Sequence, residues 1–354
     1  MKLGIIVTSY NNKSVLNDCL DSVINLRKKN SKIQFFVVVV DDCSTDGSVT
    51  LIDQYKKEKK IDVFQRNMEN KGVSYSRNQG LLFCKDTDYV TFLDADDTVN
   101  QEFLKISEKT LWADLILCNF SYFETHTGLK KEEIFFTCEK HISEIEMVDY
   151  LSKYYTQPNK CSLLTTCWAK FYKTTVLLQK NKIFFKEDLF LCEDTEFVHR
   201  FLSNQTGGVQ FINISFYQHT ITSGLANKGK ATFGTGLSLS HQLSFVWAVL
   251  ASRHYMLKNG IDPKVLKNNI LHCCGAYSMI YFIRSCLKVR TVQDFYLVKK
   301  FWSKVFDKPI FRRALSVYSS KVAGGNIALP WLVKARLYFF ASILAYFICR
   351  KRYF

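Results

Sequence analysis

The sequence predicts an α/β fold, in which a mostly parallel β-sheet is covered by helices on both faces and a helical region follows. Three observations favour it. Apolar runs and helical segments alternate over the first hundred residues, the run "IQFFVVVVDD" at 33–42 is too apolar for a strand with one exposed face, and the pattern becomes helical from about residue 231. Apolar strands that alternate with helices are typical of parallel sheets buried on both faces.

The first hundred residues supply the predicted elements in order. Short apolar runs predict strands, while helical spacing or Ser/Thr/Asp capping chemistry predicts the helices between them. The predicted strands lie at 3–10, 33–42, 61–67 and 88–94, and the predicted helices lie at 14–29, 44–58 and 72–85. Ligands bind beyond the carboxyl ends of the strands in such sheets, so we expect the functional site at that edge.

The remaining residues predict two further parts. Residues 113–124 and 209–219 read as strands and 193–205 as a helix, whereas 237–258, 266–288 and 329–354 have helical patterns. The predicted domain boundaries divide the chain into residues 1–110, residues 111–230 and a basic helical region at 231–354. The predicted linker lies at 227–236.

Composition limits the class of protein. A chain of 354 residues with 47% hydrophobic residues is long enough for a sizeable core. Its twelve cysteines have no repeating spacing and no C-x-x-C pair, which argues against a disulfide framework or a zinc site and favours reduced thiols in a cytosol. The opening "MKLGIIVTSYNN" has an apolar run too short for a signal peptide and predicts a first strand.

The net charge of +16 lies in the last third of the chain. Residues 1–230 contain 29 Lys and Arg against 29 Asp and Glu, whereas residues 231–354 contain 19 against 3. Such asymmetry suggests a nucleic-acid or membrane partner for the basic part, and no nucleic-acid motif is visible there. The apolar run at 337–349 is flanked by cations and is shorter than the roughly 20 residues of a spanning helix. It predicts an interfacial helix on an anionic membrane, although "ILHCCGAYSMIYFI" at 270–283 equally suits the core of a small helical domain.

Polar residues follow three of the predicted strands at one edge of the sheet. Thr8 to Asn11 follow the first strand, Asp41 and Asp42 follow the second, and Asp94, Asp96 and Asp97 follow the fourth. Neighbouring like charges need a partner, and a divalent cation such as Mg²⁺ or Mn²⁺ prefers carboxylate oxygens. The alternative is a solvated turn that caps a helix. The shared edge favours the metal.

Five motifs resemble those of one family. "VTSYNN", "VVVDDCSTDGS", "NKGVSYSRNQG", "TFLDADD" and "LCEDTEF" occur in the order and spacing of the family 2 glycosyltransferases, over roughly residues 1–225. Members of this family are inverting enzymes of the GT-A fold, a Rossmann-like α/β/α sandwich, and they use nucleotide-sugar donors. The resemblance therefore implies a nucleotide-sugar-binding half at 1–110 and an acceptor-binding half at 111–230. Cys43 stands where the family usually has a small residue such as glycine, and we expect it to be tolerated.

The resemblance implies the donor site. Thr8 and Asp42 would contact the base, with Asp42 accepting the N3–H of uracil and Tyr10 offering an aromatic face. The alternative for Asp42 is a helix N-cap near "STDGS". Arg77 would lie near the nucleotide; its alternative is a surface ion pair. Asp94 resembles the residue near the ribose.

The resemblance also implies the reacting groups. Asp96 matches the ligand of Mn²⁺ or Mg²⁺, which would stabilise the leaving diphosphate as a Lewis acid. Asp194 matches the catalytic aspartate that takes the proton of the acceptor hydroxyl. Glu193 is its alternative, and both acids would also be favoured in the first turn of a helix by the helix dipole alone.

Four further positions have weaker support. His219 and Ser223 resemble a basic residue and a serine close to the diphosphate, and a structural histidine is the alternative. Trp168 and Lys170 resemble the acceptor-side segment of the family. Trp168 would stack on a sugar ring, or else it belongs to the core.

Together these features predict a metal-dependent, inverting hexosyl- or N-acetylhexosaminyltransferase that uses a UDP donor. The predicted acceptor is a growing surface glycan such as capsule or lipopolysaccharide. The predicted location is the cytoplasm, peripherally bound to the inner face of the cell membrane. The alternative is a non-catalytic nucleotide-sugar-binding or scaffold protein with the same fold.

Overall fold

A computed structural model describes residues 1–29, 32–105, 111–189, 191–221, 243–286, 289–323 and 326–353. The chain forms two compact units. Unit 1 comprises Met1–Ser143, Leu163–Glu187 and Glu193–Ser223. Unit 2 comprises Glu144–Ser162, Asp188–Cys192 and Gly224–Phe354.

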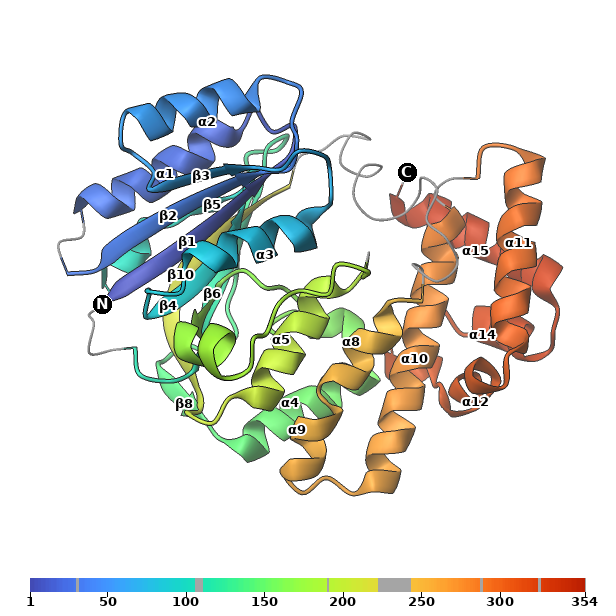
Figure 1. Ribbon diagram of the computed structural model, residues 1–354. Coiled ribbons are helices and arrows are strands. Elements are labelled where there is room, and N and C mark those ends of the chain that lie inside the picture. The colour runs from blue at the N-terminus through green and yellow to red at the C-terminus, as the bar shows by residue number, and fades with distance from the viewer. Residues whose placement is uncertain are drawn as a thin grey trace. The chain divides into compact units, whose positions relative to one another are not determined.

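Unit 1 is built on one sheet, and most of its strands are labelled in Figure 1. Four parallel strands pair in the order β3-β2-β1-β4, and the path continues through β9, β6, β10 and β5. Strand β9 is antiparallel to both β4 and β6, so the sheet is mixed beyond β4. The strands on this path are β1 (Lys2–Ser9), β2 (Gln34–Asp41), β3 (Val63–Arg66), β4 (Tyr89–Asp94), β5 (Thr98–Val99), β6 (Leu115–Glu124), β9 (Lys170–Lys173) and β10 (Val209–Ile221). Off the path, β7 (Lys130–Glu133) pairs with β6 and β8 (Lys140–Ile142) with β10.

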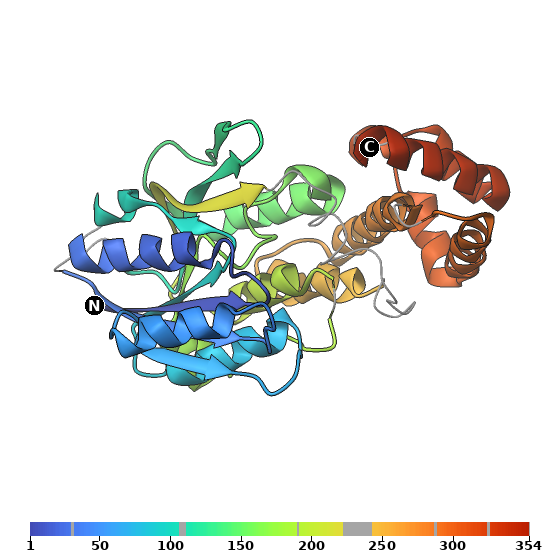
Figure 2. The ribbon, with the colours of Figure 1, turned by 90° about the horizontal axis from the view of Figure 1, so that it is seen from above.

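Helices pack on both faces of this sheet because successive strand residues point to opposite sides. Ile5 and Val7 belong to the core cluster that also contains apolar residues of α1 (Leu16–Lys29). Ile6 faces α3 (Val73–Phe83), where a Cβ added to Gly80 would fall 2.4 Å from its Cγ2 atom. Figures 1 and 2 show α1 and α3 on opposite faces. Unit 1 also contains α2 (Ser48–Lys57), α5 (Glu193–Asn204), η1 (Gln101–Lys105) and η4 (Thr175–Lys180).

The predicted parallel order of the first hundred residues is confirmed. Val37 to Val40 in β2 are fully buried, which explains the uninterrupted apolar run in the sequence. Strands β5, β7, β8 and β9 were not predicted. They are two to four residues long, too short to produce a periodic pattern.

Unit 2 is helical, and α10 (Pro263–Ser285) packs against α4, α8, α12 and α15. Asp262 caps α10 by accepting hydrogen bonds from the backbone N–H groups of Lys264 and Val265. The hydroxyls of Tyr154 and Tyr277 lie 2.9 Å apart and join α4 to α10. The helices of unit 2 are α4 (Glu144–Thr156), α8 (Phe245–Ala251), α9 (Arg253–Lys258), α10 (Pro263–Ser285), α11 (Val292–Asp307), α12 (Pro309–Val317), α13 (Ser320–Ala323), α14 (Ala328–Lys334) and α15 (Tyr338–Tyr353), and η3 (Pro158–Lys160) also belongs to this unit.

The apolar segment at 270–283 lies almost entirely in the core of unit 2, as the helical-domain alternative predicted. Among the described helices, none is both long enough and apolar enough to cross a bilayer. The predicted linker at 227–236 lies outside the described residues. The three functional parts at 1–110, 111–230 and 231–354 stay predictions, because the two units group residues by contact and not by function.

Candidate active site

The carboxyl ends of three parallel strands bring several predicted residues together. Strand register pairs Thr8 with Asp94 and Ser9 with Asp41. The Thr8 Oγ1 atom lies 3.5 Å from Asp94 Oδ1, and the backbone N–H of Asp42 donates to the carbonyl of Ser9. The polar groups expected at one edge of the sheet are therefore at one edge.

Asp42 organises the loop that precedes α3. Its Oδ1 atom accepts from the Asn67 side chain at 2.8 Å and from the Lys71 backbone N–H at 3.0 Å, and its Oδ2 atom accepts from the Gly72 N–H at 2.7 Å. Oδ2 retains a second lone pair for a further donor. The turn before α2 is held instead by Asp41, which accepts from the backbone N–H and the hydroxyl of Ser44.

The loop after β1 and β2 contains an exposed ring and a left-handed backbone. Tyr10 is 48% exposed, so its ring is open to a ligand. Cys43 has a φ of 66°, in the region that glycine occupies at least cost. This conformation explains why a glycine is usual at that position, and Cys43 adopts it.

Arg77, on α3, joins two of the predicted acids. Its Nη2 atom lies 2.9 Å from Asp94 Oδ1, and its Nη1 atom lies 2.6 Å from Asp194 Oδ1 and 3.9 Å from Glu193. The Arg77 side chain is 3% exposed, so it does not form the surface ion pair considered as its alternative. Burial alone would lower the pKa of Arg77, but the charges of Asp194, Asp94 and Glu193 outweigh burial and raise the pKa.

Asp194 and Glu193 occupy the first turn of α5. Besides Arg77, Asp194 accepts the backbone N–H of Cys167 at 3.2 Å on Oδ2. Burial and then the charge of Asp194 raise the pKa of Glu193 to about 7, while Arg77 opposes that rise. The two acids therefore lie in the first turn of a helix and also face Arg77. The helix dipole and the Arg77 charge both favour the ionised carboxylates.

The three acids of "DADD" have different surroundings. Asp97 is buried and accepts from the Tyr217 hydroxyl, from the Thr220 backbone N–H at 2.7 Å and from His219, whose Nδ1 lies 3.1 Å away. In the described part of the chain, no other residue forms a hydrogen bond or an ion pair with the Asp96 carboxylate. Burial, followed by the charges of Asp97 and Asp94, raises the pKa of Asp96 to about 6.

A cation fits this arrangement chemically. Asp96 is a carboxylate that needs a positive partner, and His219 turns Nδ1 toward Asp97, which leaves Nε2 as a second donor. Burial lowers the pKa of His219, but its bond to Asp97 and the nearby acids raise it overall. No group of three ligating side chains exists among the described residues. The residues therefore suit a cation that takes its other ligands from water and a diphosphate, as Mg²⁺ commonly does.

Trp168 and Lys170 are buried beside the site. The Trp168 ring is 7% exposed and stacks on Tyr217 at 4.4 Å, which favours the core alternative for it. Lys170 donates from Nζ to the Trp168 carbonyl at 3.1 Å and to the Thr166 hydroxyl at 3.2 Å, and burial lowers its pKa to about 8. Lys170 thus supports the loop whose Cys167 N–H reaches Asp194. Direct acceptor contacts of both residues stay predictions, and Ser223 lies outside the described residues.

Sequence reasoning missed Tyr217, whereas it expected Asp97 to support the site without binding the metal directly. Tyr217 and His219 are two residues apart on β10, so their side chains lie on the same face of the sheet. The alternation in "FYQHT" is the signal that could have placed Tyr217 beside His219.

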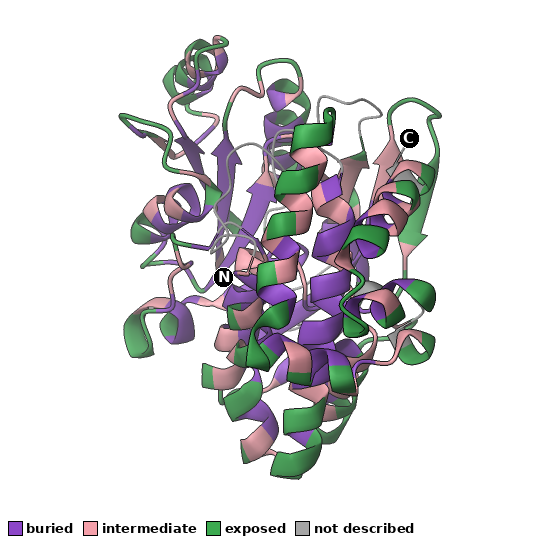
Figure 3. Ribbon diagram, turned by 90° about the vertical axis from the view of Figure 1, so that its right-hand side faces the viewer, coloured by how far each residue is buried: buried purple, intermediate pink, exposed green. Residues whose placement is uncertain are grey.

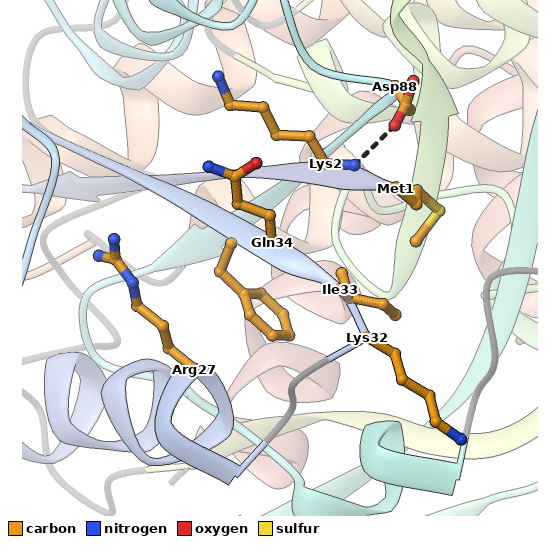
Figure 4. Close-up of a pocket in the computed structure, with 8 residues that line it drawn as sticks. Met1, Lys2, Arg27, Lys32, Ile33, Gln34 and Asp88 are labelled. Atoms are coloured by element: carbon orange, nitrogen blue, oxygen red, sulfur yellow. Dashed lines mark hydrogen bonds between the residues drawn. The ribbon is translucent and has the colours of Figure 1, made fainter.

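A cavity of about 470 Å³ lies elsewhere on unit 1, and Figure 4 shows it at the amino ends of β1 and β2. Its Arg27 is bound to both oxygens of Asp62 at 3.0 Å, and the backbone N–H of Lys2 donates to Asp88 at 2.6 Å. The predicted site residues do not line this cavity.

The fold and the edge site together define an α/β protein of the GT-A type. Residues 4–170 match the model of glycosyl transferase family 2. This part of the chain is therefore a family 2 glycosyltransferase domain.

Curated relatives agree with this assignment. The chain is 29% identical over 228 residues to glycosyltransferase GlyA of Streptococcus pneumoniae, covering 63% of this chain and 31% of the relative. It is 29% identical over 197 residues to poly(ribitol-phosphate) β-N-acetylglucosaminyltransferase TarS of Staphylococcus aureus, covering 56% and 32%. The chain thus spans about a third of the length of these relatives.

The crystal structure of S. aureus TarS 1-349 in complex with UDP-GlcNAc superposes with a TM-score of 0.65 and 20% identity, covering all of this chain and 91% of that one. This likeness confirms the predicted GT-A fold with a C-terminal helical region.

Proposed function

We propose that unit 1 transfers a hexosyl or N-acetylhexosaminyl group from a UDP-sugar to a hydroxyl group, with inversion at C1. The observation that carries the proposal is the bridge from Asp94 through Arg77 to Asp194, next to the uncommitted carboxylate of Asp96. It holds an acid of a separate helix close to the strand edge at which the donor would bind, so a candidate base lies beside the proposed donor site. The N-acetylglucosaminyltransferase name of TarS and its crystal structure with UDP-GlcNAc support a UDP donor.

The donor binds at the ends of β1, β2 and β4 in this proposal. Thr8 and the free lone pair of Asp42 contact the base, and Tyr10 covers its face. Asp94 lies next to the ribose, while Arg77 holds Asp94 in position by donating to its Oδ1 atom.

Asp96 would hold the divalent cation, with His219 Nε2 as the second protein ligand. The bound Mn²⁺ or Mg²⁺ supplies Lewis-acid stabilisation of the departing diphosphate. Asp97 orients His219 through Nδ1, because that hydrogen bond fixes the direction of the ring.

Asp194 acts as the general base. It accepts the proton of the acceptor hydroxyl while that oxygen attacks C1 and the bond from C1 to the diphosphate oxygen breaks on the opposite side. Arg77 and the Cys167 N–H each occupy one lone pair of a different Asp194 oxygen, so a lone pair remains to take the proton. Glu193 is the neighbouring acid that would substitute if Asp194 serves only to hold Arg77.

The acceptor is a growing bacterial surface glycan in this proposal, such as a capsule, a lipopolysaccharide or a related polymer. The name of TarS, which specifies poly(ribitol-phosphate), supports a polymer of this class. The enzyme works in the cytoplasm and attaches peripherally to the inner face of the membrane through the basic region at 231–354. The charge excess of that region supports the attachment.

A donor panel tests the proposal. UDP-glucose, UDP-GlcNAc, UDP-galactose and GDP-mannose are compared for thermal stabilisation and for nucleotide release, with Mn²⁺ and with chelator. We expect one UDP-sugar to stabilise the protein and its turnover to stop with chelator. We expect Asp194→Asn to bind this donor normally and to lose at least about 100-fold in turnover.

The matched control is Asp53→Asn, an exposed acid on α2, which should behave as the wild type. Normal turnover by Asp194→Asn would remove Asp194 as the base. Failure of all four donors to stabilise the protein would contradict the proposed donor class.

A further inference from the structure

Helix α15 of unit 2 turns its small residues inward and its large apolar residues outward. Ala341, Ala345 and Cys349 are fully buried, whereas Phe340 is 58% and Phe347 is 64% exposed. Helices of water-soluble domains normally bury the large apolar face. This reversal leaves aromatic surface in contact with water. We take the exposed aromatic face as evidence that a binding partner covers it.

The exposed side forms a continuous apolar stripe. Phe340, Leu344 and Phe347 follow the four- and three-residue spacing that puts side chains on one face of a helix, and Lys351 continues the same row. Leu344 is partly exposed and Lys351 is exposed. We call Phe340, Leu344 and Phe347 the α15 stripe. Figure 3, which faces the C-terminal helices, marks the exposed residues of these helices in green.

Positive charge frames the α15 stripe. Exposed Arg336 precedes α15 and exposed Lys351 follows the stripe near its far end. Residues 308–354 contain nine Lys and Arg and no Asp or Glu. The nearest acid in the sequence, Asp307, binds Arg312 at 2.7 Å and the Tyr338 hydroxyl at 2.7 Å, and its Oδ1 atom also lies 4.0 Å from Nε of Arg336. This single carboxylate next to the stretch cannot neutralise nine cations.

A neighbouring helix adds a further exposed aromatic. Trp331 on α14 is 63% exposed, although Leu329 and Val333 on the same helix are buried. Helix α14 packs against α15. Trp is enriched where apolar surface meets a polar boundary, because its ring is apolar and its N–H finds a polar partner.

This combination selects one class of partner. A second copy of the chain would bring two strongly positive surfaces together, which opposes a dimer through this face. An anionic bilayer satisfies both features, since its acyl boundary takes Phe and Trp while its head groups bind Lys and Arg. We propose that α15 lies in the plane of an anionic membrane surface, with the α15 stripe inserted at the acyl boundary. This inference rests on the membrane attachment proposed above and specifies which face of the predicted interfacial helix inserts.

Vesicle binding by the full chain tests the inference. The probes are vesicles of phosphatidylcholine with and without about a third phosphatidylglycerol, at low and high salt. We expect the wild type to sediment with the anionic vesicles at low salt. We expect Phe340→Ser with Phe347→Ser to weaken that binding by at least about tenfold. The matched control exchanges two exposed apolar residues of unit 1, Leu129→Ser with Ile134→Ser, and should bind as the wild type.

A charge variant keeps the test valid if the double Phe variant does not fold. Arg336→Gln with Lys351→Gln alters exposed side chains and should weaken binding several-fold and reduce its dependence on salt. UDP-sugar stabilisation of each variant in the absence of vesicles should equal that of the wild type, so loss of donor binding is distinguished from loss of membrane binding.

Three results would overturn the inference. The first is a wild type that does not sediment with anionic vesicles, and the second is a Phe variant that binds them as tightly as the wild type. The third is a wild-type dimer in solution that becomes a monomer in the Phe variant. The third result would assign the α15 stripe to an interface between copies of the chain.

Discussion

Arg77 gives a demanding test of the site, because one buried guanidinium contacts acids from two separate elements. Arg77→Met removes the cation and keeps much of the side-chain volume. Loss of one partner from a buried ion pair costs about 3–5 kcal/mol. The Asp94 and Asp194 side chains are 30% and 17% exposed, so solvent reduces this cost to about 2–4 kcal/mol. We expect the melting temperature to fall by roughly 4–16 °C.

The loss of stability in Arg77→Met should also depend on pH, because Arg77 influences the pKa of Glu193. Burial and the charge of Asp194 raise the pKa of Glu193 to about 7, and Arg77 limits that rise. Without Arg77 the pKa rises further. A carboxyl whose pKa is higher in the folded than in the unfolded state makes the protein less stable as pH rises through that interval. The loss in Arg77→Met should therefore be larger at pH 8 than at pH 5.

Urea unfolding of both proteins at pH 5 and pH 8 measures the two effects. The control is Arg66→Met, whose side chain is 50% exposed and lies 3.9 Å from Asp41. Such a pair contributes about 0–1 kcal/mol, so the control should unfold close to the wild type. The reasoning is refuted if Arg77→Met unfolds as the control does, or if its deficit is the same at both pH values.

Three further predictions follow from the same geometry. Burial lowers the pKa of Lys170 to about 8, so its protonated form destabilises the fold. In urea titrations, the unfolding free energy of the wild type minus that of Lys170→Met should therefore rise by about 2 kcal/mol from pH 8 to pH 10. An unchanged difference would contradict the burial of the Lys170 charge. The wild type should lose stability between pH 5 and pH 8 as Glu193 ionises, and Glu193→Gln should make this loss about 1–2 kcal/mol smaller. If the unfolding free energies of both proteins change in parallel with pH, Glu193 titrates normally. Asp96→Asn should weaken UDP binding in the presence of Mn²⁺ at least about tenfold in calorimetry. UDP binding without metal and the melting temperature should stay the same or rise, because the variant removes one of several like charges. Unchanged Mn²⁺ dependence would exclude Asp96 as a metal ligand.

The sequence was most informative where the pattern was long. The apolar run of β2 and the helical spacing of α1 predicted the parallel part of the sheet, because their periods extend over eight and fourteen residues. Strand β9 has four residues and pairs antiparallel between β4 and β6, which no local pattern reveals. Likewise α4 joins the helices of unit 2 through contacts with residues more than 90 positions away.

The site was predictable as a set of residues but not as a network. The strand ends placed Thr8, Asp42 and Asp94 at one edge, because register follows from parallel pairing. The bridge from Arg77 to Asp194 spans 117 positions and depends on how α5 packs, so the sequence could not supply it. The division of labour between Asp96 and Asp97 also needed coordinates, since only the structure shows Asp97 bound to His219.

A crystal structure of the chain with UDP and Mn²⁺ would test the central claim most directly. The account predicts that the uracil contacts Thr8 and Asp42 and that the cation directly contacts an Asp96 oxygen. It also predicts that Asp194 faces the space for the donor sugar, on the side opposite the diphosphate. Nucleotide bound elsewhere on unit 1, or a cation that avoids Asp96, would contradict the account.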